Sequence, residues 1–374
     1  MSRRTLVVTN DFPPRAGGIQ AYVHTLVARQ PPGSMVVFAS TSAGAAAFDA
    51  EQPFPVVRYP TGLLLPTPDV LRRTREVARA EGCTAVWFGA AAPLALLAPG
   101  LRRAGVERVV AATHGHEVGW AAVPGGRQAL RRIGRTVDVV TYLGEYTRSR
   151  LAPALGPGTE LRRLPPGVDT ATFSPAVDGE PVRRRYRLAD RPTVVCVSRL
   201  VPRKGQDTLI RAWPEVRRRV AGAALLVVGR GRDLPRLRRL ADAHGVAGDV
   251  VLTGGVPWAE LPAHYAAGHV FAMPCRTRRG GLDVEGLGIV YLEASATGLP
   301  VVAGDSGGAP DAVRPGETGY VVSGRDRAAV ADRVATLLTD RGAARAMGEK
   351  GRSWVEQEWR WDALAARLGH LLRD

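Results

Sequence analysis

The chain of 374 residues predicts an α/β protein built from two Rossmann-like domains, each with a parallel sheet. Short β-branched runs alternate with amphipathic helical segments almost throughout, as in parallel sheets covered on both faces. The length exceeds what one ordinary core accommodates. Near the middle, residues 161–181 (LRRLPPGVDTATFSPAVDGEP) are rich in proline, glycine and short polar residues, which indicates a linker.

The first half of the chain contains five expected strands, at residues 5–9, 34–40, 85–89, 108–114 and 138–144. Helical patterns lie between them, as at residues 19–30 and 70–82. We expect this domain to span residues 1–168.

The same alternation restarts after the linker, with strands expected at residues 193–198, 224–229, 249–254, 269–274, 300–304 and 318–322. We expect this second domain to span residues 169–356. The final helix, at about 357–374, is expected to pack back on the first domain. Ligands of open parallel sheets bind beyond the carboxyl ends of the strands, so we expect a ligand-binding cleft between the domains.

The composition is that of an ordinary globular protein, with 45% hydrophobic and 23% charged residues. No uninterrupted apolar run approaches the length of about 18 residues that spans a bilayer, and the N-terminus has no signal-peptide pattern. Three scattered cysteines fit neither a disulfide framework nor a metal site. These features predict a cytoplasmic protein.

The formal net charge is +16, and nearly all of the positive charge is arginine, since the chain has two lysines, Lys204 and Lys350. A generally basic solvated surface and adhesion to an anionic surface or substrate both stay open. Nucleic-acid binding is disfavoured, because no basic stripe interleaved with aromatic residues is present.

The loop after the first strand reads NDFPPRAGGIQAYV and places Gly17 and Gly18 just where a helix begins. Glycine lets backbone amides approach a ligand closely, and a helix N-terminus attracts anions. The spacing is not the G-x-G-x-x-G of a dinucleotide site, which counts against a nicotinamide dehydrogenase. A glycine-rich turn without a ligand is the alternative.

The fourth strand ends in THGHEVGW, which brings His114, His116 and Glu117 to the carboxyl end of an apolar strand. Histidine exchanges protons and hydrogen bonds near neutral pH, so this cluster indicates function. Metal binding is the weaker interpretation, because the sequence contains no second cluster of ligands.

The second half opens with SRLVPRKG, where Arg199 and Lys204 lie in the loop after a strand. A guanidinium fork and an ammonium point charge together suit a diphosphate. An incidental surface lysine is the alternative.

The stretch EGLGIVYLE places Glu285 and Glu293 within an apolar segment, where an unpaired carboxylate is costly to bury. A helix is expected from about Gly288 to Thr297, which puts Glu285 in the preceding loop and Glu293 in the second helical turn. Carboxylates accept hydrogen bonds from vicinal diols such as those of sugars, while amides at the helix start would contact a phosphate.

With these motifs, the chain resembles glycosyltransferase family 4, whose GT-B fold sets two Rossmann-like domains facing each other across a cleft. The resemblance rests on E-x7-E at Glu285 and Glu293 with the following EASATGLPVVAGDSGGAPD, on SRLVPRKG, and on Gly17 and Gly18. Longer strings, among them TNDFPPRAGGIQ, THGHEVGW and GGLDVEGLGIVYLEA, are similar to the phosphatidylinositol mannoside mannosyltransferases of that family.

The resemblance implies a retaining, metal-independent α-mannosyltransferase without a cofactor, which moves mannose from GDP-mannose to a mannosylated phosphatidyl-myo-inositol. It implies that Arg199 and Lys204 stabilise the charge on the departing GDP, the term that is usually largest in catalysis. By the same resemblance, Glu285 binds the 3- and 4-hydroxyls of the transferred sugar and Glu293 binds the ribose.

Further residues receive roles from the resemblance. His114 would lie near the transferred sugar and complete a catalytic set with Arg199, Lys204 and Glu285. The amides that would add donors to the diphosphate are those of Gly17, Gly18, Leu287, Gly288, Ile289 and Val290. The acceptor-side candidates are Asn10, His116 and Glu117.

Two basic amphipathic segments, residues 71–80 and 127–135, lie in the half that binds the acceptor in this family. Such segments are attracted to anionic membranes, so we expect peripheral association with the inner face of the cell membrane. The alternatives are a related enzyme using a UDP- or ADP-sugar or another acceptor, and a non-catalytic binder of nucleotide sugar or nucleic acid.

Overall fold

The structure, a computed structural model, describes residues 4–374. It divides into two compact units, and the chain visits the first unit twice. Unit 1 comprises the chain up to Pro166 together with Trp361–Asp374, and unit 2 comprises Gly167–Arg360. The division falls two residues before the expected end of the first domain, and the returning helix begins at Trp361 rather than near residue 357.

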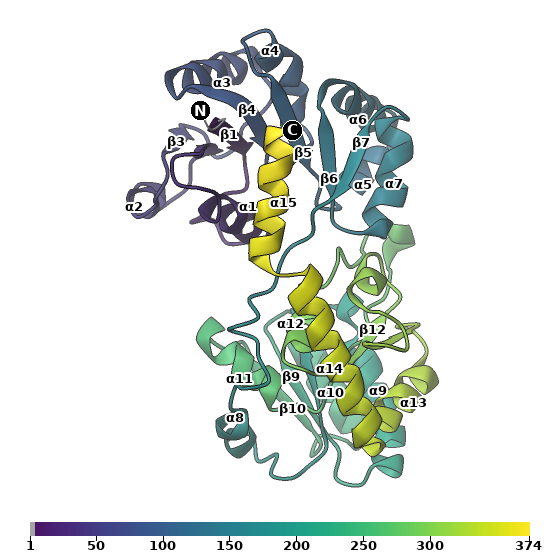
Figure 1. The fold of residues 1–374 in the computed structure, drawn as a ribbon. Helices are drawn as coiled ribbons and strands as arrows, with labels where there is room; N and C mark the ends of the chain where they lie inside the picture. Colours follow the sequence, from purple (N-terminus) through teal and green to yellow (C-terminus); the bar gives the residue numbers. More distant parts are fainter. Residues whose placement is uncertain (1–3) are drawn as a thin grey trace. The chain divides into compact units, whose positions relative to one another are not determined.

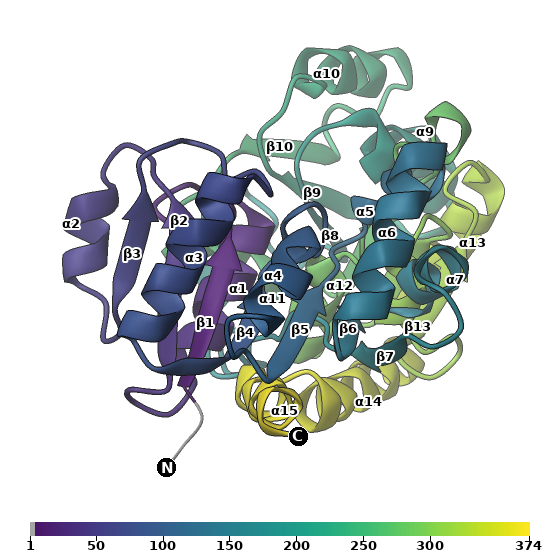
Figure 2. The ribbon, with the colours of Figure 1, turned by 90° about the horizontal axis from the view of Figure 1, so that it is seen from above.

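Unit 1 contains a seven-stranded parallel sheet in the order β3-β2-β1-β4-β5-β6-β7, which can be followed across Figure 2. Its strands are β1 (Arg4–Thr9), β2 (Met35–Ser40), β3 (Val56–Tyr59), β4 (Cys83–Phe88), β5 (Arg108–Ala112), β6 (Val139–Tyr142) and β7 (Glu160–Arg163). The sequence did not predict β3 and β7. Both are four-residue edge strands without fully buried side chains, so they lack the apolar run that marks the interior strands.

Helices cover both faces of this sheet. They are α1 (Gly18–Ala28), α2 (Ala45–Ala50), α3 (Pro68–Ala80), α4 (Ala98–Arg102), α5 (Glu117–Ala121), α6 (Pro124–Thr136), α7 (Glu145–Leu155) and α15 (Trp361–Arg373). Successive residues of β1 alternate between two apolar layers, with Leu6 and Val8 in one and Val7 in the other. The second layer is closed by α1 and by α15, which runs beside α1 in Figure 1.

Unit 2 contains a six-stranded parallel sheet in the order β10-β9-β8-β11-β12-β13. Its strands are β8 (Thr193–Val197), β9 (Ala224–Val228), β10 (Val250–Gly254), β11 (Val270–Met273), β12 (Val301–Gly304) and β13 (Gly319–Val322). All six lie within the expected ranges. The strand order reverses between β8 and β11, and ligands of such sheets bind at the carboxyl edge of that reversal.

The helices of unit 2 are α8 (Glu180–Arg185), α9 (Gln206–Arg219), α10 (Leu234–Ala243), α11 (Leu261–Ala266), α12 (Ile289–Ala296), α13 (Arg327–Thr339) and α14 (Arg341–Glu358). One apolar cluster fills the unit and includes the fully buried Trp213 and Trp359. Two parallel sheets covered by helices confirm the predicted fold class. Within residues 4–374, no helix combines the length and the apolar character needed to cross a bilayer.

Candidate active site

Two loops at the carboxyl edge of the unit 2 sheet carry the residues that the sequence singled out there, and a third loop packs against one of them. The loop after β8 holds Arg199 and Lys204, and the loop after β11 leads through Glu285 into α12. The turn after β12, residues 305–308, packs against this second loop.

The Lys204 side chain is buried beside Glu285. Its Nζ lies 2.6 Å from Glu285 Oε2. The next residue, Gly205, has φ 80°, and a Cβ at this position would lie 2.0 Å from the Pro274 carbonyl oxygen, so only glycine lets the loop after β8 pack this closely on the chain after β11. The sequence did not predict this ion pair.

The backbone of Glu285 is held by the turn after β12. The Glu285 amide donates to Ser306 Oγ at 3.2 Å, and the Gly308 amide donates to the Glu285 carbonyl at 2.9 Å. A Cβ at Gly307 would lie 2.0 Å from that carbonyl oxygen. The DSGG turn therefore positions Glu285, a role that the sequence pattern alone did not reveal.

The start of α12 presents unused backbone donors. Gly288 precedes the helix with φ 79°, in the left-handed region, and Glu293 lies in the second turn. The predicted placement of Glu285 in the loop and Glu293 in the helix is thus confirmed. None of the amides from residues 287 to 290 makes a hydrogen bond within the described residues. Such amides at a helix N-terminus attract an anion.

Glu293 is buried, with 6% of its surface exposed, and its Oε2 accepts a hydrogen bond of 2.6 Å from the Tyr265 hydroxyl. Burial raises the pKa of the Glu293 carboxyl to about 7, although the hydrogen bond from Tyr265 acts in the opposite direction. Glu293 therefore titrates near neutral pH. Tyr265, on α11, was not among the predicted site residues.

A pocket of about 620 Å³, here called the edge pocket, opens at the same edge of the sheet. Its lining includes five arginines from three loops, Arg199, Arg203, Arg230, Arg232 and Arg279. Arg203 lies 3.6 Å from Asp283, which also lines the pocket. The side chains of the other four make no ion pair or hydrogen bond with the described residues. The pocket therefore carries uncompensated positive charge, which favours an anionic ligand.

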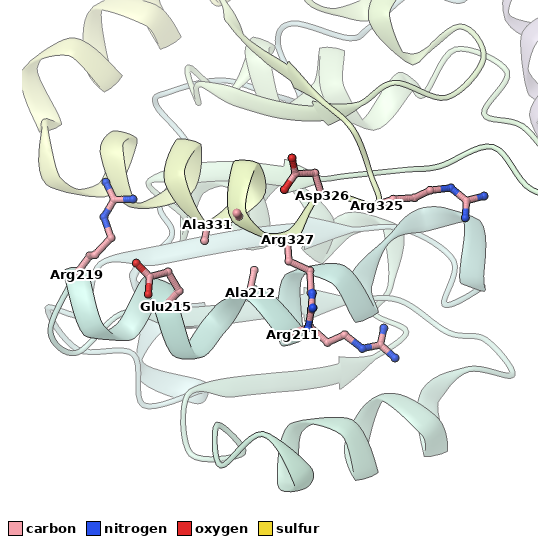
Figure 3. Close-up of a pocket in the computed structure, with 9 residues that line it drawn as sticks. Arg211, Ala212, Glu215, Arg219, Arg325, Asp326, Arg327 and Ala331 are labelled. Atoms are coloured by element: carbon pink, nitrogen blue, oxygen red, sulfur yellow. The ribbon is translucent and has the colours of Figure 1, made fainter.

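A second hollow of unit 2, of about 600 Å³ and here called the outer groove, lies between α9 and α13 (Figure 3). Four arginines line it, Arg211, Arg219, Arg325 and Arg327, together with Glu215 and Asp326. Arg219 lies 3.0 Å from Asp332, Arg211 lies 2.8 Å from Asp207, and Arg325 donates to a backbone carbonyl. Because two of its four arginines are paired with carboxylates and two acidic residues also line it, the outer groove is less favourable to an anion than the edge pocket.

His114 lies in unit 1 at the end of β5. Its Nε2 is 2.6 Å from the carbonyl oxygen of Gly89, and the ring packs edge-on against Tyr22 with centroids 5.0 Å apart. A carbonyl oxygen can only accept, so Nε2 carries the proton. Burial lowers the pKa of the His114 imidazole, which favours the neutral ring with Nδ1 as a hydrogen-bond acceptor.

Glu117 is fully buried and shapes the turn that carries both histidines. Its Oε2 accepts a 2.9 Å hydrogen bond from the His114 amide, and its Oε1 lies 3.3 Å from His116 Nε2. The two imidazole rings stack with centroids 6.3 Å apart. Glu117 thus faces the protein interior, whereas His116 is exposed.

Asn10, the third acceptor-side candidate, holds a loop with both ends of its side-chain amide. Its Nδ2 donates to the Leu64 carbonyl at 2.9 Å, and its Oδ1 accepts from the Leu64 amide at 2.6 Å. The loop that it holds exposes Leu63 and Leu65. The contacts of Asn10 are therefore structural.

Gly17 and Gly18 lie at the start of α1 in unit 1. A Cβ added to Gly18 would meet no atom within 4 Å, so the helix start is open at this point. Unit 1 thus holds Gly17, Gly18 and His114, while unit 2 holds the predicted basic and acidic donor-site residues. No group of three or more His, Cys, Asp or Glu side chains suited to a metal ion occurs within residues 4–374.

Two family models match the chain. The model described as Glycosyltransferase Family 4 matches residues 16–172, and the model described as Glycosyl transferases group 1 matches residues 180–354. The first match lies mostly in unit 1 and the second lies within unit 2.

Curated relatives match over nearly the whole chain. A protein of Mycobacterium tuberculosis named GDP-mannose-dependent alpha-(1-6)-phosphatidylinositol monomannoside mannosyltransferase is 57% identical over 99% of this chain and 98% of its own length. A relative of the same name from Mycolicibacterium smegmatis is 56% identical over 98% and 97%. A relative from Corynebacterium glutamicum, whose name adds "monoacylated", is 49% identical over 100% and 98%.

Solved structures share the fold at low sequence identity. Anabaena Alr3699/HepE in complex with UDP matches with a TM-score of 0.82 and 18% identity, over 99% of both chains. Sucrose-phosphate synthase from Thermosynechococcus elongatus matches with a TM-score of 0.77 and 23% identity, over 99% of this chain and 98% of that one.

Proposed function

Because the chain belongs to glycosyltransferase family 4, we propose that it transfers mannose from GDP-mannose to a mannosylated phosphatidyl-myo-inositol. The observation that carries this proposal is the 57% identity, over 99% of the chain, to a relative named for that reaction. Relatives of closely similar name from two further genera support the same donor and acceptor over a UDP- or ADP-sugar.

The chemistry at the carboxyl edge of unit 2 suits this reaction. When the bond from the sugar to the phosphate oxygen breaks, negative charge grows on the departing GDP. Arg199, Lys204 and the amides of residues 287–290 are groups that can stabilise such charge. We assign the sugar hydroxyls to Glu285 and the ribose hydroxyls to Glu293.

The ion pair between Lys204 and Glu285 explains how the unliganded site tolerates both groups. Burying either charge alone is costly, and each offsets that cost for the other. A bound donor would supply new partners, with phosphate oxygens for the ammonium and sugar hydroxyls for the carboxylate. The pair thus holds both side chains in place until the donor binds.

We further propose that configuration at the transferred sugar is retained, through same-face attack with a tight ion pair, and that no metal is required. The cationic side chains and the amides at the start of α12 would stabilise the negative charge on the departing diphosphate in place of a metal ion. His114 is assigned to the transferred sugar, where a neutral ring offers Nδ1 to a hydroxyl, and Gly17 and Gly18 would add amides to the diphosphate. His116, which is exposed, is assigned to the acceptor side.

We also propose a cytoplasmic enzyme that associates peripherally with the inner membrane face. Arg72 and Arg73 on α3 pair with acidic neighbours, whereas the exposed Arg132 and Arg135 on α6 have no ion pair in the described chain. Basic residues contribute about 1 kcal/mol each at an anionic surface. We therefore favour α6 as the membrane contact.

Flotation with anionic vesicles at low salt tests this contact. The double substitution Arg132→Glu/Arg135→Glu should weaken flotation more than Arg72→Glu/Arg73→Glu does. If the unmodified protein does not float with the vesicles, the proposed membrane association is wrong.

A donor screen tests the central proposal. The protein is incubated with phosphatidylinositol monomannoside and GDP-mannose, UDP-glucose or ADP-glucose, and the lipid product is measured. We expect product with GDP-mannose, with the anomeric configuration retained and no loss on chelation of divalent metals. Product from a UDP-sugar but not from GDP-mannose would overturn the donor assignment. If none of the three donors gives product, a non-catalytic binder is favoured.

Glu285→Ala tests the division of roles between the two glutamates. We expect it to abolish transfer and to leave GDP affinity nearly intact, because GDP lacks the sugar that Glu285 is assigned to hold. An equal collapse of GDP affinity, measured by calorimetry, would show that the division is wrong.

A further inference from the structure

We propose that Tyr265 is a positioning residue for the nucleotide donor and acts through the Glu293 carboxylate. This inference rests on the proposed function, since it assigns Glu293 to the donor. The Tyr265 hydroxyl donates to Glu293 Oε2 at 2.6 Å, and Glu293 Oε1 accepts no hydrogen bond from the described residues. One carboxylate oxygen is thus held by the protein, and the other is available to a ligand.

The ring of Tyr265 is fixed before any ligand binds. It is fully buried in unit 2, stacks on Phe271 with centroids 5.7 Å apart, and meets Phe173 edge-on at 5.5 Å. A buried hydroxyl needs a hydrogen-bond acceptor, which Glu293 supplies. Because the aromatic contacts fix the ring, the hydroxyl in turn fixes the carboxylate, and the carboxylate needs no reorganisation when the donor binds.

The charges around the pair favour a dependence on pH. Burial raises the pKa of Glu293 to about 7 and raises the pKa of Tyr265 well above its ordinary value, so the tyrosine stays a neutral donor. Cys196 on β8 faces Tyr265, and burial raises its thiol pKa to about 12, so it is uncharged. On α14, which packs against α12, Arg352 donates to the Ala296 carbonyl. No cation lies at ion-pair distance from Glu293 within residues 4–374.

In the absence of such a cation, the hydrogen bond from Tyr265 is what favours the ionised form of Glu293. An ionised carboxylate accepts hydrogen bonds from ribose hydroxyls more strongly than a protonated one. Tyr265 should therefore matter most near pH 7, where Glu293 is partly protonated. It should matter least near pH 9, where the carboxyl is ionised with or without the hydroxyl.

Tyr265→Phe tests this inference, because it removes the hydroxyl and keeps the ring. GDP affinity is measured by calorimetry on the full chain from pH 6 to pH 9. For the unmodified protein we expect affinity to rise through about pH 7. For the variant we expect the rise about one pH unit higher, affinity roughly fivefold weaker at pH 7, and recovery toward pH 9.

Tyr291→Phe is the matched control. Tyr291 is equally buried, lies on the same helix as Glu293, and donates its hydroxyl to the Met273 carbonyl at 2.7 Å. We expect this control to lose a similar amount of stability and to keep the pH profile of the unmodified protein. Superimposed profiles for Tyr265→Phe and the unmodified protein, or an equal shift in the control, would overturn the inference.

A ligand-free measurement separates this inference from the proposed function. The carboxyl carbon of Glu293, assigned by comparison with Glu293→Gln, is titrated by NMR in the unmodified protein and in Tyr265→Phe. We expect the pKa to rise by about one unit in the variant, the equivalent of a tenfold change. Failure to bind GDP at any pH would refute the proposed function, whereas an unchanged Glu293 pKa would refute the role of Tyr265.

Discussion

The edge pocket and the outer groove of unit 2 have nearly the same volume, about 620 and 600 Å³, and both are rich in arginine. They differ in what the arginines contact. In the outer groove, two of the four lining arginines, Arg219 and Arg211, pair with carboxylates, and two acidic residues also line the groove. In the edge pocket, four of the five arginines have no acidic partner among the described residues. A hollow lined by arginines is therefore not itself a mark of binding, whereas a hollow that leaves its arginines unpaired favours an anion.

The largest expected difference between the carboxyl edge of unit 2, which carries Lys204 and the edge pocket, and the outer groove is in catalysis. Lys204→Ala removes a cation assigned to the leaving diphosphate, and we expect kcat to fall by roughly 10²- to 10³-fold. Arg219→Ala removes a cation from the outer groove and should leave kcat within about twofold, since it touches no group assigned to the donor. Steady-state transfer from GDP-mannose measures both. A comparable loss in the two variants would show that overall charge matters rather than position.

The second difference is in stability, because burying the Glu293 carboxylate at the carboxyl edge should lower the free energy of unfolding. Burial raises the pKa of Glu293 from 4.5 to about 7, so the folded protein loses stability as pH rises through that interval. Glu293→Gln removes the ionisation and keeps an acceptor for Tyr265. Above pH 7 we expect it to raise the free energy of unfolding by on the order of 3 kcal/mol.

Urea denaturation at pH 8 and pH 4 checks this gain. The variant should be more stable than the unmodified protein at pH 8 and similar to it at pH 4, where Glu293 is protonated in both the folded and the unfolded chain. A variant that is less stable at pH 8 would show that the ionised carboxylate is well accommodated in the fold.

A third prediction concerns the unpaired arginines themselves. Arg230→Ala/Arg232→Ala should weaken GDP binding about tenfold at low salt, and the difference should shrink in 0.5 M NaCl as the charges are screened, at about 4 Å Debye length. Stability should be unchanged, because neither side chain has a partner to lose. The control Arg238→Ala/Arg239→Ala removes the same charge from α10, outside the pocket lining. Equal weakening in the control would mean that the edge pocket is not the site of the effect.

The smallest expected effect is in the outer groove. Arg219 and Asp332 form a partly exposed pair, and such pairs contribute about 0–1 kcal/mol. Arg219→Ala should therefore lower the free energy of unfolding by less than about 1 kcal/mol and leave GDP affinity unchanged. A loss of GDP affinity, detected by calorimetry, would assign the outer groove a part in binding.

Much of the fold could be predicted from the sequence, for a physical reason. Strands buried on both faces, such as β8 and β12, need continuous apolar runs, and those runs are visible without a structure. The edge strands β3 and β7 were missed because their half-exposed side chains leave no such run. The carboxyl edge could be predicted as the binding edge because parallel topology fixes it.

The sequence predicts the residues assigned to the ligand, but it does not predict the residues that hold them in place. The spacing of Glu285 and Glu293 and the lysine of SRLVPRKG are local signals. Tyr265 and Ser306 reach these glutamates from other elements, and only the packed structure brings them together. Likewise, the sequence shows that Glu117 is polar but not that its carboxylate turns inward to hold the His114 amide.

The last helix of the chain sets the order in which the protein can be assembled. Leu364, Leu368 and Leu372 of α15 belong to one of the two apolar layers of unit 1. On the ribosome, the earlier residues of unit 1 emerge first, but α1 alone covers part of that face, and α15 can complete the layer only after all of unit 2 has been synthesised. Domains usually fold as units, N-terminal first. Here the N-terminal unit can be completed only last, and a chain that ends near Arg360 lacks the leucines with which α15 completes the apolar layer.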